Sequence, residues 1–384
     1  MNIGMFADCY IPAVNGVTSS IRSLKNELEN QGHNVYLFVP SYSGYTIDTE
    51  KNTFRFKSIP YPFQKEHRIS FPFPRKYINM IPSLNLDVVH LHTPFPVGIM
   101  GMKNAKKYNL PCVFTHHTLW EKYTHYLPLL PEKMRVKLAV SLCVNFANKC
   151  RMVIAPSTGV KKLFACQGVK TKIEVVPSGI NFDKFSKGSA GSFLNLYPQL
   201  KNKKILSYCG RLGREKNLYF LLRVFKAVSA GYSDAHLLFI GDGPQRNNLM
   251  DYVKELGLIN KVTFSGYLAP EKVADALSAS YLFVFASTTE TQGLVIQEAQ
   301  AAGCPAVAVK ATGVEDAVTD AEDGYLTCLD EEEMALRCLR VLEMPKLRDA
   351  LSINGKIKAE KYSIENTTKK VLGVYNQAIA LSNS

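Results

Sequence analysis

Two glutamates, Glu290 and Glu298, lie eight residues apart in the segment TETQGLVIQEA. The first is in a loop after an apolar strand, and the second is about two turns along the following Ala-rich helix, at 3.6 residues per turn. Carboxylates placed in this way can bind different hydroxyls of a sugar nucleotide. Glutamates on helices are common, so the spacing alone is equally compatible with two solvated side chains.

Cations and glycines occur together in residues 209–217, CGRLGREKN, at a predicted strand–helix junction. Arg211 and Lys216 are the residues there best suited to a pyrophosphate, because cations beside flexible glycines favour such a ligand. A surface loop with solvated charges is the alternative. Gly16, in the first loop, can let backbone amides approach a phosphate, although a plain tight turn fits equally well. The spacing is not GxGxxG, so a nicotinamide fingerprint is not supported.

Two histidine pairs, His90/His92 and His116/His117, each follow a predicted strand. Histidine can act as an acid, a base or a metal ligand. The chain has no HExxH or Cys/His zinc spacing, and it has no Asp-x-Asp. The sequence therefore predicts no bound catalytic metal and no bound cofactor.

Strand and helix patterns alternate along both halves of the chain, which predicts parallel sheets covered by helices on both faces. Residues 184–203 are polar, rich in Gly and Ser and then basic, and they are predicted to separate two doubly wound α/β domains. The predicted domains are 1–188 and 189–361, followed by a helix at 362–384. The predicted strands are 2–7, 34–39, 87–92, 112–116, 173–176, 205–209, 236–240, 262–265, 281–286 and 306–309. The predicted helices between them include 132–149, 158–166, 217–230, 244–256, 271–279 and 292–302.

The 384 residues carry a formal charge of +13, and this excess is confined to one half of the chain. Residues 1–200 hold 24 Lys and Arg against 11 Asp and Glu, whereas the rest holds 22 of each. Such asymmetry favours an anionic partner, namely nucleic acid, a phosphorylated ligand or an anionic membrane, over ordinary solubilising charge. There is no apolar run long enough to span a membrane and no signal-peptide pattern, and the nine cysteines are scattered, as in a reducing cytoplasm.

Aromatic and basic side chains occur together in residues 61–81, a combination suited to lipid headgroups. Three prolines there predict a docking loop rather than a long helix. Residues 132–151 form a second basic stretch with a clearer helical pattern. The residues predicted to contact a membrane or acceptor are Lys65, Arg68, Phe71, Phe73, Arg75, Lys76, Lys133, Arg135 and Lys137.

The whole chain resembles the retaining GT-B glycosyltransferases of the family-4 type. The most specific element of the resemblance is ETQGLVIQE. CGRLGREKN, FIGDGP, PSGIN and NGV also match, in the family's order along the chain and at its intervals. It implies an α/β GT-B fold, in which two Rossmann-like domains face each other across a cleft. The N-terminal domain would bind the acceptor and the C-terminal domain the donor, and the C-terminal helix would cross back to the N-terminal domain.

The resemblance also implies a role for individual residues. Arg211 and Lys216 would bind the donor pyrophosphate, which the backbone at Gly16 would approach, and Glu298 would bind the ribose. Glu290, with the backbone of Gln292, Gly293 and Leu294, would face the donor sugar, and His117 would lie close to the reacting carbon. The implied reaction is metal-independent hexosyl transfer with retention, for which no nucleophile is assigned.

The segments MNIGMFADCYIPAVNGV and HHTLWEKYTHYLP are most similar to the diacylglycerol glucosyltransferase branch. We therefore expect a peripheral enzyme on the cytoplasmic face of a membrane that moves glucose from UDP-glucose to 1,2-diacylglycerol. Phosphatidylinositol, a lipopolysaccharide core and a soluble sugar are alternative acceptors, and the sequence fixes neither the donor base nor the sugar. A non-catalytic nucleic-acid-binding protein is a remote alternative, because no recognition-helix or RNP pattern is present.

Overall fold

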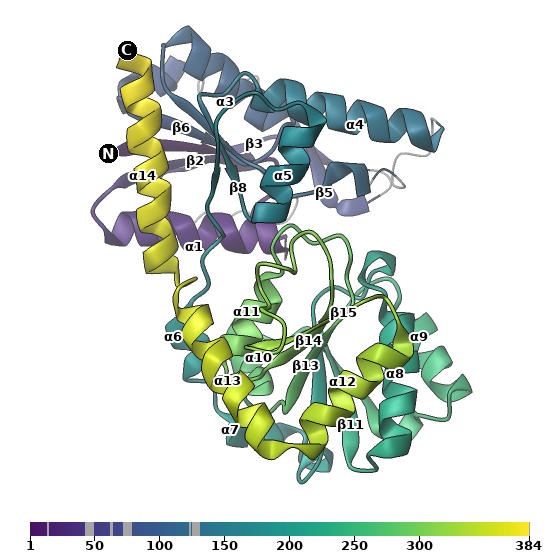
Figure 1. Cartoon of the computed structure of the whole chain (residues 1–384). Coiled ribbons are helices and arrows are strands. Elements are labelled where there is room, and N and C mark those ends of the chain that lie inside the picture. Colours follow the sequence, from purple (N-terminus) through teal and green to yellow (C-terminus); the bar gives the residue numbers. More distant parts are fainter. Residues whose placement is uncertain are drawn as a thin grey trace. The chain divides into compact units, whose positions relative to one another are not determined.

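The computed structural model describes residues 1–13, 15–42, 50–61, 64–71, 79–122, 124 and 131–383, with only the backbone of residues 64–67 and 383. The chain forms two compact units (Figure 1). One contains residues 1–179 and 364–384, and the other contains residues 180–363.

The first unit is built on a parallel sheet of order β3-β2-β1-β6-β7-β8-β9. Apolar residues fill its strands because a sheet covered on both faces buries alternate side chains in either direction. Its strands are β1 (Asn2–Phe6), β2 (Asn34–Pro40), β3 (Thr53–Phe56), β6 (Val88–Leu91), β7 (Cys112–Thr115), β8 (Met152–Ala155) and β9 (Ile173–Val175). A separate antiparallel hairpin pairs β4 (Ser58–Tyr61) with β5 (Gln64–Ser70).

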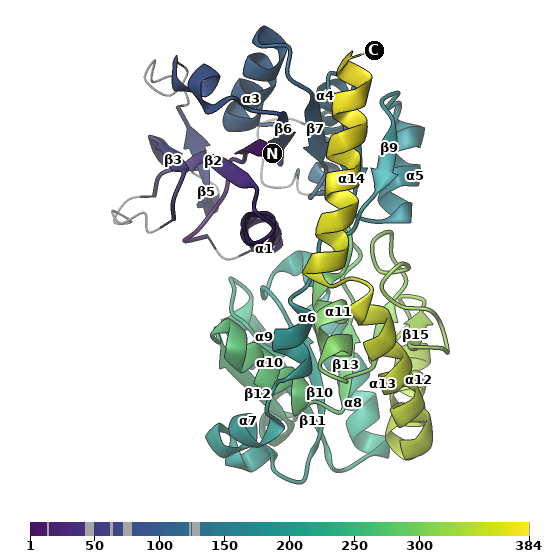
Figure 2. The same ribbon diagram turned by 90° about the vertical axis from the view of Figure 1, so that its left-hand side faces the viewer.

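Helices cover both faces of this sheet. One face packs against α1 (Gly16–Asn30) and α14 (Ile364–Asn383), and Ile21, Leu24 and Tyr375 belong to that core. The other face packs against α3 (Pro96–Lys107), α4 (Glu132–Ala147) and α5 (Thr158–Gln167). Figure 2 shows α14 running beside this sheet, so the C-terminal helix returns to the N-terminal unit as predicted.

The second unit has a parallel sheet of order β12-β11-β10-β13-β14-β15. Its strands are β10 (Lys204–Cys209), β11 (Ala235–Ile240), β12 (Val262–Gly266), β13 (Leu282–Phe285), β14 (Ala306–Val309) and β15 (Gly324–Thr327). Its helices are α6 (Phe182–Ser186), α7 (Ala190–Leu196), α8 (Leu218–Gly231), α9 (Arg246–Glu255), α10 (Pro270–Ser278), α11 (Leu294–Ala301), α12 (Glu331–Glu343) and α13 (Pro345–Glu360). The prediction of two doubly wound α/β units is confirmed.

The strand orders identify where each unit is expected to bind a ligand. In both sheets the chain moves outward from the first strand and then returns to its other side, which makes a switch point between β1 and β6 and another between β10 and β13. Loops diverge at such a point, and a crevice opens at the carboxyl ends of the strands. The loops after β10 and β13 contain the two motifs of residues 209–217 and 289–299.

The boundary between the units lies at Gly179 and Ile180, earlier than the predicted division at 188/189. Residues 184–203 are not a linker, because they contribute to α6 and α7, and Phe185 and Phe193 are buried in the second unit's core. A Cβ on Gly188 would lie 2.4 Å from the Ala274 carbonyl oxygen, so this glycine allows a close backbone approach to α10. The Gly- and Ser-rich composition of this segment predicted a linker, although the segment contains these two buried phenylalanines.

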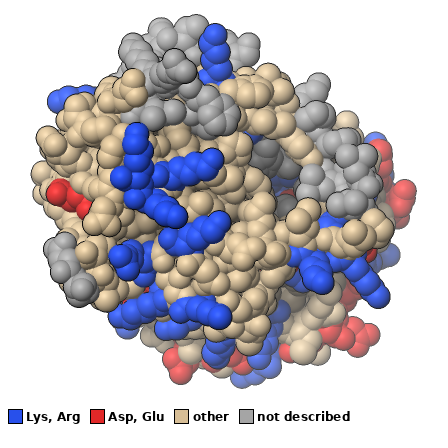
Figure 3. Space-filling view, turned by 90° about the horizontal axis from the view of Figure 1, so that it is seen from above, with Lys and Arg blue, Asp and Glu red and all other residues tan. Residues whose placement is uncertain are grey.

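The charge asymmetry follows the structural units. Counted over their residues, the first unit holds 24 Lys and Arg against 11 Asp and Glu, and the second holds 22 of each. Figure 3 shows basic side chains gathered on one face with few acidic ones among them. Exposed cations also cluster near the amino ends of β7, β8 and β9, at Lys106, Lys107, Lys149, Arg151, Lys170 and Lys172. The excess is therefore not confined to the carboxyl end of the sheet, where a substrate is expected.

Candidate active site

Two glycine-containing loops pack together at the carboxyl ends of β10 and β11. The Leu212 amide donates to the Asp242 carbonyl at 2.9 Å, and the Gln245 amide donates to the Leu212 carbonyl at 3.0 Å. Gly241 has a φ of +126°, and a Cβ there would lie 2.2 Å from the Gly210 oxygen. The GDGP segment therefore supports the loop of residues 209–217, and Asp242 does not cap α9, whose N-cap is Gln245.

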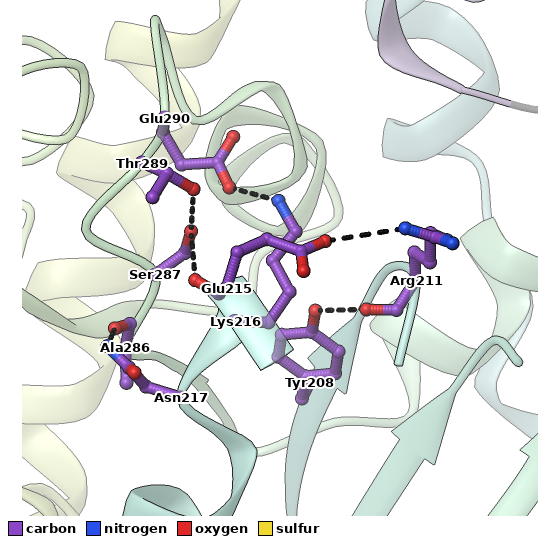
Figure 4. A network of polar contacts seen from close by, with 9 residues as sticks. All are labelled: Tyr208, Arg211, Glu215, Lys216, Asn217, Ala286, Ser287, Thr289 and Glu290. Carbon is purple, nitrogen blue, oxygen red and sulfur yellow. Dashed lines mark hydrogen bonds and ion pairs between the residues drawn. The ribbon is translucent and has the colours of Figure 1, made fainter. Parts of the chain in front are cut away.

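Lys216 and Glu290 form an ion pair that joins the loops following β10 and β13. Lys216 Nζ lies 2.6 Å from Glu290 Oε1, and the two side chains are 16% and 21% exposed. Figure 4 shows the two side chains pointing toward each other. Burial alone would raise the pKa of Glu290, but the charge and hydrogen bond of Lys216, with a hydrogen bond from Ser287, lower it below its ordinary 4.5. Glu290 is therefore an ionised carboxylate at neutral pH.

Arg211 forms an ion pair with Glu215, a residue that the sequence did not lead us to select. Arg211 Nη1 lies 3.7 Å from Glu215 Oε1, and the Glu215 side chain is only 5% exposed. The Tyr208 hydroxyl donates to the Arg211 carbonyl at 3.1 Å (Figure 4). Gly213 makes room for the carboxylate, because a Cβ there would lie 2.3 Å from Glu215 Oε1. The buried Glu215 carboxylate therefore orients the Arg211 guanidinium. The Glu-Lys pair in GREKN is the sequence feature from which this role of Glu215 could have been predicted.

The loop carrying Glu290 depends on Gly313, another residue that the sequence reasoning missed. A Cβ on Gly313 would lie 2.3 Å from the Thr291 carbonyl carbon and 2.4 Å from the Gln292 nitrogen. Gly293 has a φ of +74° and precedes α11, which begins at Leu294. Gln292 is buried, and its side-chain amide donates to Gln297 at 3.0 Å. The backbone of residues 292–294 is thus fixed at the N-terminus of α11, where amide groups favour anionic or polar ligands.

Glu298 lies on α11 and is half-buried. Burial raises its pKa to about 7, and the charge of Lys184 opposes this only in part. The carboxyl group can therefore lose its proton near neutral pH and accept hydrogen bonds from hydroxyl groups. This behaviour suits a ribose-binding role but does not by itself assign one.

Four histidines at the carboxyl ends of β6 and β7, namely His90, His92, His116 and His117, divide between the two faces of the sheet. His92 and His117 lie on the face covered by α1 and α14, and His92 Nδ1 is 3.0 Å from His117 Nε2. His116 points to the other face and packs against Phe164, with ring centroids 4.0 Å apart. Burial lowers the pKa of His117 to about 4, so this imidazole is neutral at pH 7. Of the two histidines in THHT, His117 is therefore the one that belongs to the histidine cluster on the α1 and α14 face.

Gly16 begins α1 at the switch point of the first unit. Asn15 caps the helix by accepting a hydrogen bond from the Thr18 amide at 2.9 Å. No heavy atom of the described chain lies within 4 Å of a Cβ built on Gly16. The folded unit itself therefore does not require a glycine here, and the predicted role in phosphate approach stays a prediction.

The predicted membrane residues fall into three groups. The Lys65 side chain and residues Phe73, Arg75 and Lys76 lie outside the described part of the structure. Two arginines are engaged within the protein, Arg68 with Ser58 Oγ and O at 2.9 Å each and Arg135 with the Thr124 carbonyl at 2.7 Å. The exposed residues are Phe71, Lys133 and Lys137.

Helix α4 also exposes three apolar side chains that the sequence reasoning did not select. Met134, Leu138 and Leu142 are 57%, 58% and 39% exposed. Their spacing of four residues places them on one side of the helix, next to Lys133 and Lys137. The result is an apolar stripe bordered by cations.

Among the described residues, none of the helices combines the length and the apolar character of a membrane span. The described part of the chain also contains no group of three or more His, Cys, Asp or Glu side chains arranged to hold a metal ion.

Comparison with known proteins agrees with this architecture. Residues 14–184 match the family model "Glycosyltransferase Family 4", and residues 197–358 match "Glycosyl transferases group 1". The chain is 31% identical to the alpha-monoglucosyldiacylglycerol synthase of Streptococcus pneumoniae, over 100% of this chain and 87% of that protein. It is 30% identical to the enzyme of that name from Acholeplasma laidlawii, over 100% and 98%. The crystal structure of Anabaena Alr3699/HepE in complex with UDP has the same fold, with a TM-score of 0.79, 18% identity and coverage of 98% of this chain and 100% of that one.

Proposed function

The chain belongs to glycosyltransferase family 4, in its diacylglycerol glucosyltransferase branch, and we propose that it transfers glucose from UDP-glucose to the 3-hydroxyl of 1,2-diacylglycerol. The observation that carries the acceptor and the sugar is full-length similarity, at 30–31% identity, to two enzymes named alpha-monoglucosyldiacylglycerol synthase. The donor nucleotide, the retention of configuration and the membrane surface are further parts of the proposal.

We assign the stabilisation of the leaving nucleotide to Arg211 and Lys216, the cations at the second unit's switch point. When the bond between the anomeric carbon and the diphosphate breaks, negative charge develops on the leaving UDP. Arg211 and Lys216 would stabilise that charge, and Glu215 keeps the Arg211 guanidinium oriented. Preorganised charges of this kind lower the barrier without reorganising during the reaction.

Glu290 and Glu298 would bind hydroxyl groups at the two ends of the donor. Glu290 is ionised and fixed by Lys216, so it suits the sugar hydroxyls. Glu298, eight residues later on α11, suits the ribose. In the retaining route we propose, the acceptor hydroxyl attacks the face from which UDP departs, and a phosphate oxygen of the donor takes the hydroxyl proton.

In this proposal, α4 of the first unit contacts the lipid surface. This helix follows β7 and returns toward the start of β8, so its first turns lie near the carboxyl end of the sheet, as His117 does. The stripe of Met134, Leu138 and Leu142 can enter the headgroup region while Lys133 and Lys137 attract anionic lipids. Each such cation contributes about 1 kcal/mol.

A donor and acceptor screen tests the chemistry. UDP-, GDP- and ADP-hexoses are offered with diacylglycerol, phosphatidylinositol and soluble sugars, and product mass and anomeric NMR are recorded. We expect one glucose on diacylglycerol in the α configuration. Transfer only to phosphatidylinositol or soluble sugars would overturn the acceptor, and a β product would overturn retention.

Vesicle flotation tests the membrane surface separately. Leu138→Asp is expected to reduce binding to phosphatidylglycerol vesicles, whereas Leu336→Asp, on α12 of the other unit and 66% exposed, is expected to bind like wild type. Lys133→Gln with Lys137→Gln should weaken binding about 30-fold, corresponding to about 2 kcal/mol. Equal binding to neutral and anionic vesicles at low salt contradicts the electrostatic part, and unchanged binding by Leu138→Asp contradicts the apolar part.

A further inference from the structure

Four buried side chains, Tyr375, Thr115, His90 and His92, form a series of hydrogen bonds and one ring contact that ends at His117. His90 Nδ1 lies 2.7 Å from the Tyr375 hydroxyl of α14, and His90 Nε2 lies 2.6 Å from Thr115 Oγ1. Both nitrogens of His90 are thus engaged, which fixes its ring. The His92 ring packs against the His90 ring at a centroid distance of 4.0 Å, with the two planes tilted by 39°. His92 Nδ1 in turn contacts His117 Nε2.

The contact between His92 and His117 contains one proton. The ordinary pKa of histidine is 6.5, and burial, with the neighbouring histidines, lowers the pKa of His92 well below it. Burial also lowers the pKa of His117 to about 4, so both rings are neutral at pH 7. A neutral imidazole has one N–H and one acceptor nitrogen. Between His92 Nδ1 and His117 Nε2, 3.0 Å apart, one must donate and the other must accept.

The surroundings of His92 Nε2 favour one of the two arrangements. This nitrogen is buried and makes no hydrogen bond with a described residue. If His117 donated, the proton of His92 would be on Nε2, as a buried N–H without a protein acceptor. If His92 donates from Nδ1, Nε2 is an unprotonated nitrogen instead. Buried N–H groups without an acceptor are rarer in proteins than buried acceptors without a donor.

We propose that His92 is a positioning residue that sets the tautomer of His117. His92 Nδ1–H donates to His117 Nε2, so the proton of His117 lies on Nδ1. His117 then meets its ligand as a hydrogen-bond donor from Nδ1, suited to a hydroxyl or phosphate oxygen of the donor. The effect on turnover rests on the proposed function, whereas the tautomer is a property of the free protein.

Nitrogen NMR of the full chain tests the tautomer directly. The protein is labelled with ¹⁵N-histidine, two-bond nitrogen–proton couplings are recorded at pH 7, and the His117 signals are assigned by their loss in His117→Ala. The expected result is His117 protonated at Nδ1 in wild type. A wild-type His117 protonated at Nε2 would overturn the proposal, whatever the enzyme's substrates.

Substitutions of His92 test the consequence. His92→Phe keeps a ring of similar size but removes the donor, and we expect kcat to fall about 10–100-fold with a smaller change in the KM for UDP-glucose, as for other residues that orient a functional histidine. His92→Asn keeps an N–H near the position of Nδ1 and should restore most of the activity. His116→Phe is the matched control, because His116 is buried beside His117 but faces the opposite side of the sheet.

The outcomes separate positioning from folding and from the choice of substrate. A merely structural role for His92 would lower the melting temperature of His92→Phe without moving the His117 proton. His92→Phe with the wild-type tautomer and wild-type kcat would contradict the proposal. If UDP-glucose is not the donor, the tautomer measurement still decides the role of His92, and the donor screen alone fails.

Discussion

The ion pair between Lys216 and Glu290 gives the sharpest quantitative prediction. Lys216→Met removes the cation and leaves a carboxylate that is only 21% exposed. Removing one partner of a fully buried pair costs about 3–5 kcal/mol, and exposed pairs are worth about 0.2–1 kcal/mol. Partial exposure places Lys216→Met between these limits, at about 2 kcal/mol. For a unit of this size that is a fall of about 4–8 °C in melting temperature.

The pH dependence of this loss has a definite sign. Lys216 lowers the pKa of Glu290 below 4.5, so the pair stabilises the fold above that pH. The stabilisation disappears as the pH falls through the lowered pKa of the folded state. The difference in melting temperature between wild type and Lys216→Met should therefore be largest near pH 7 and should shrink once the pH falls below 4.5 and through the lowered pKa of Glu290.

UDP binding separates the two partners of the pair. If Lys216 binds the diphosphate as proposed, Lys216→Met removes a charge-assisted bond worth about 1.5–3 kcal/mol, and the Kd for UDP by calorimetry should rise about 10–150-fold. Glu290→Gln removes a negative charge beside the same site, so its Kd for UDP should be unchanged or lower while turnover falls. Near-normal turnover in Glu290→Gln would remove this residue from the active site.

A second lysine in the same unit is the matched control. Lys203 pairs with Asp234 at 3.1 Å, but the side chains are 38% and 63% exposed. Lys203→Met should cost less than about 1 kcal/mol and leave UDP binding unchanged. The reasoning is refuted if Lys216→Met melts like Lys203→Met, or if Glu290→Gln weakens UDP as much as Lys216→Met does.

Three further substitutions test the site. Burial raises the pKa of Glu298 to about 7, so wild-type stability should decline between pH 4.5 and 7. Glu298→Gln should lack that decline in thermal melts and bind UDP about 10-fold more weakly, and an unchanged pH profile would contradict the burial effect. Gly16→Ala should melt like wild type, since a Cβ meets no described atom within 4 Å, but raise the KM for UDP-glucose about 10-fold if donor phosphates approach that backbone. Gly313→Ala should cost about 1–3 kcal/mol in unfolding free energy and lower kcat, because a Cβ would overlap Thr291 and Gln292, and normal values of both would refute the support role.

Much of the fold was predictable from local patterns. Most predicted strands agree with the observed ones within one or two residues, because buried parallel strands are short apolar runs with clear ends. The predictions missed four strands of the first unit, β3, β4, β5 and β8, and also α3, β15, α12 and α13. They also mistook α6 and α7 for a linker. In the last case two buried phenylalanines, Phe185 and Phe193, are embedded in a polar stretch, so composition outweighed the local apolar signal.

The sequence by itself determined which charged and polar residue types follow each strand, because residue types and short spacings are local properties of a chain. Glu290, Glu298, Arg211 and Lys216 were therefore predictable as a set. Only the tertiary structure decided which of these side chains meet and what supports them. Gly313 lies under the Glu290 loop, and Tyr375 reaches His90 across 285 residues of sequence. Such contacts depend on strand order and on the return of α14, and no short-range pattern in the sequence specifies either.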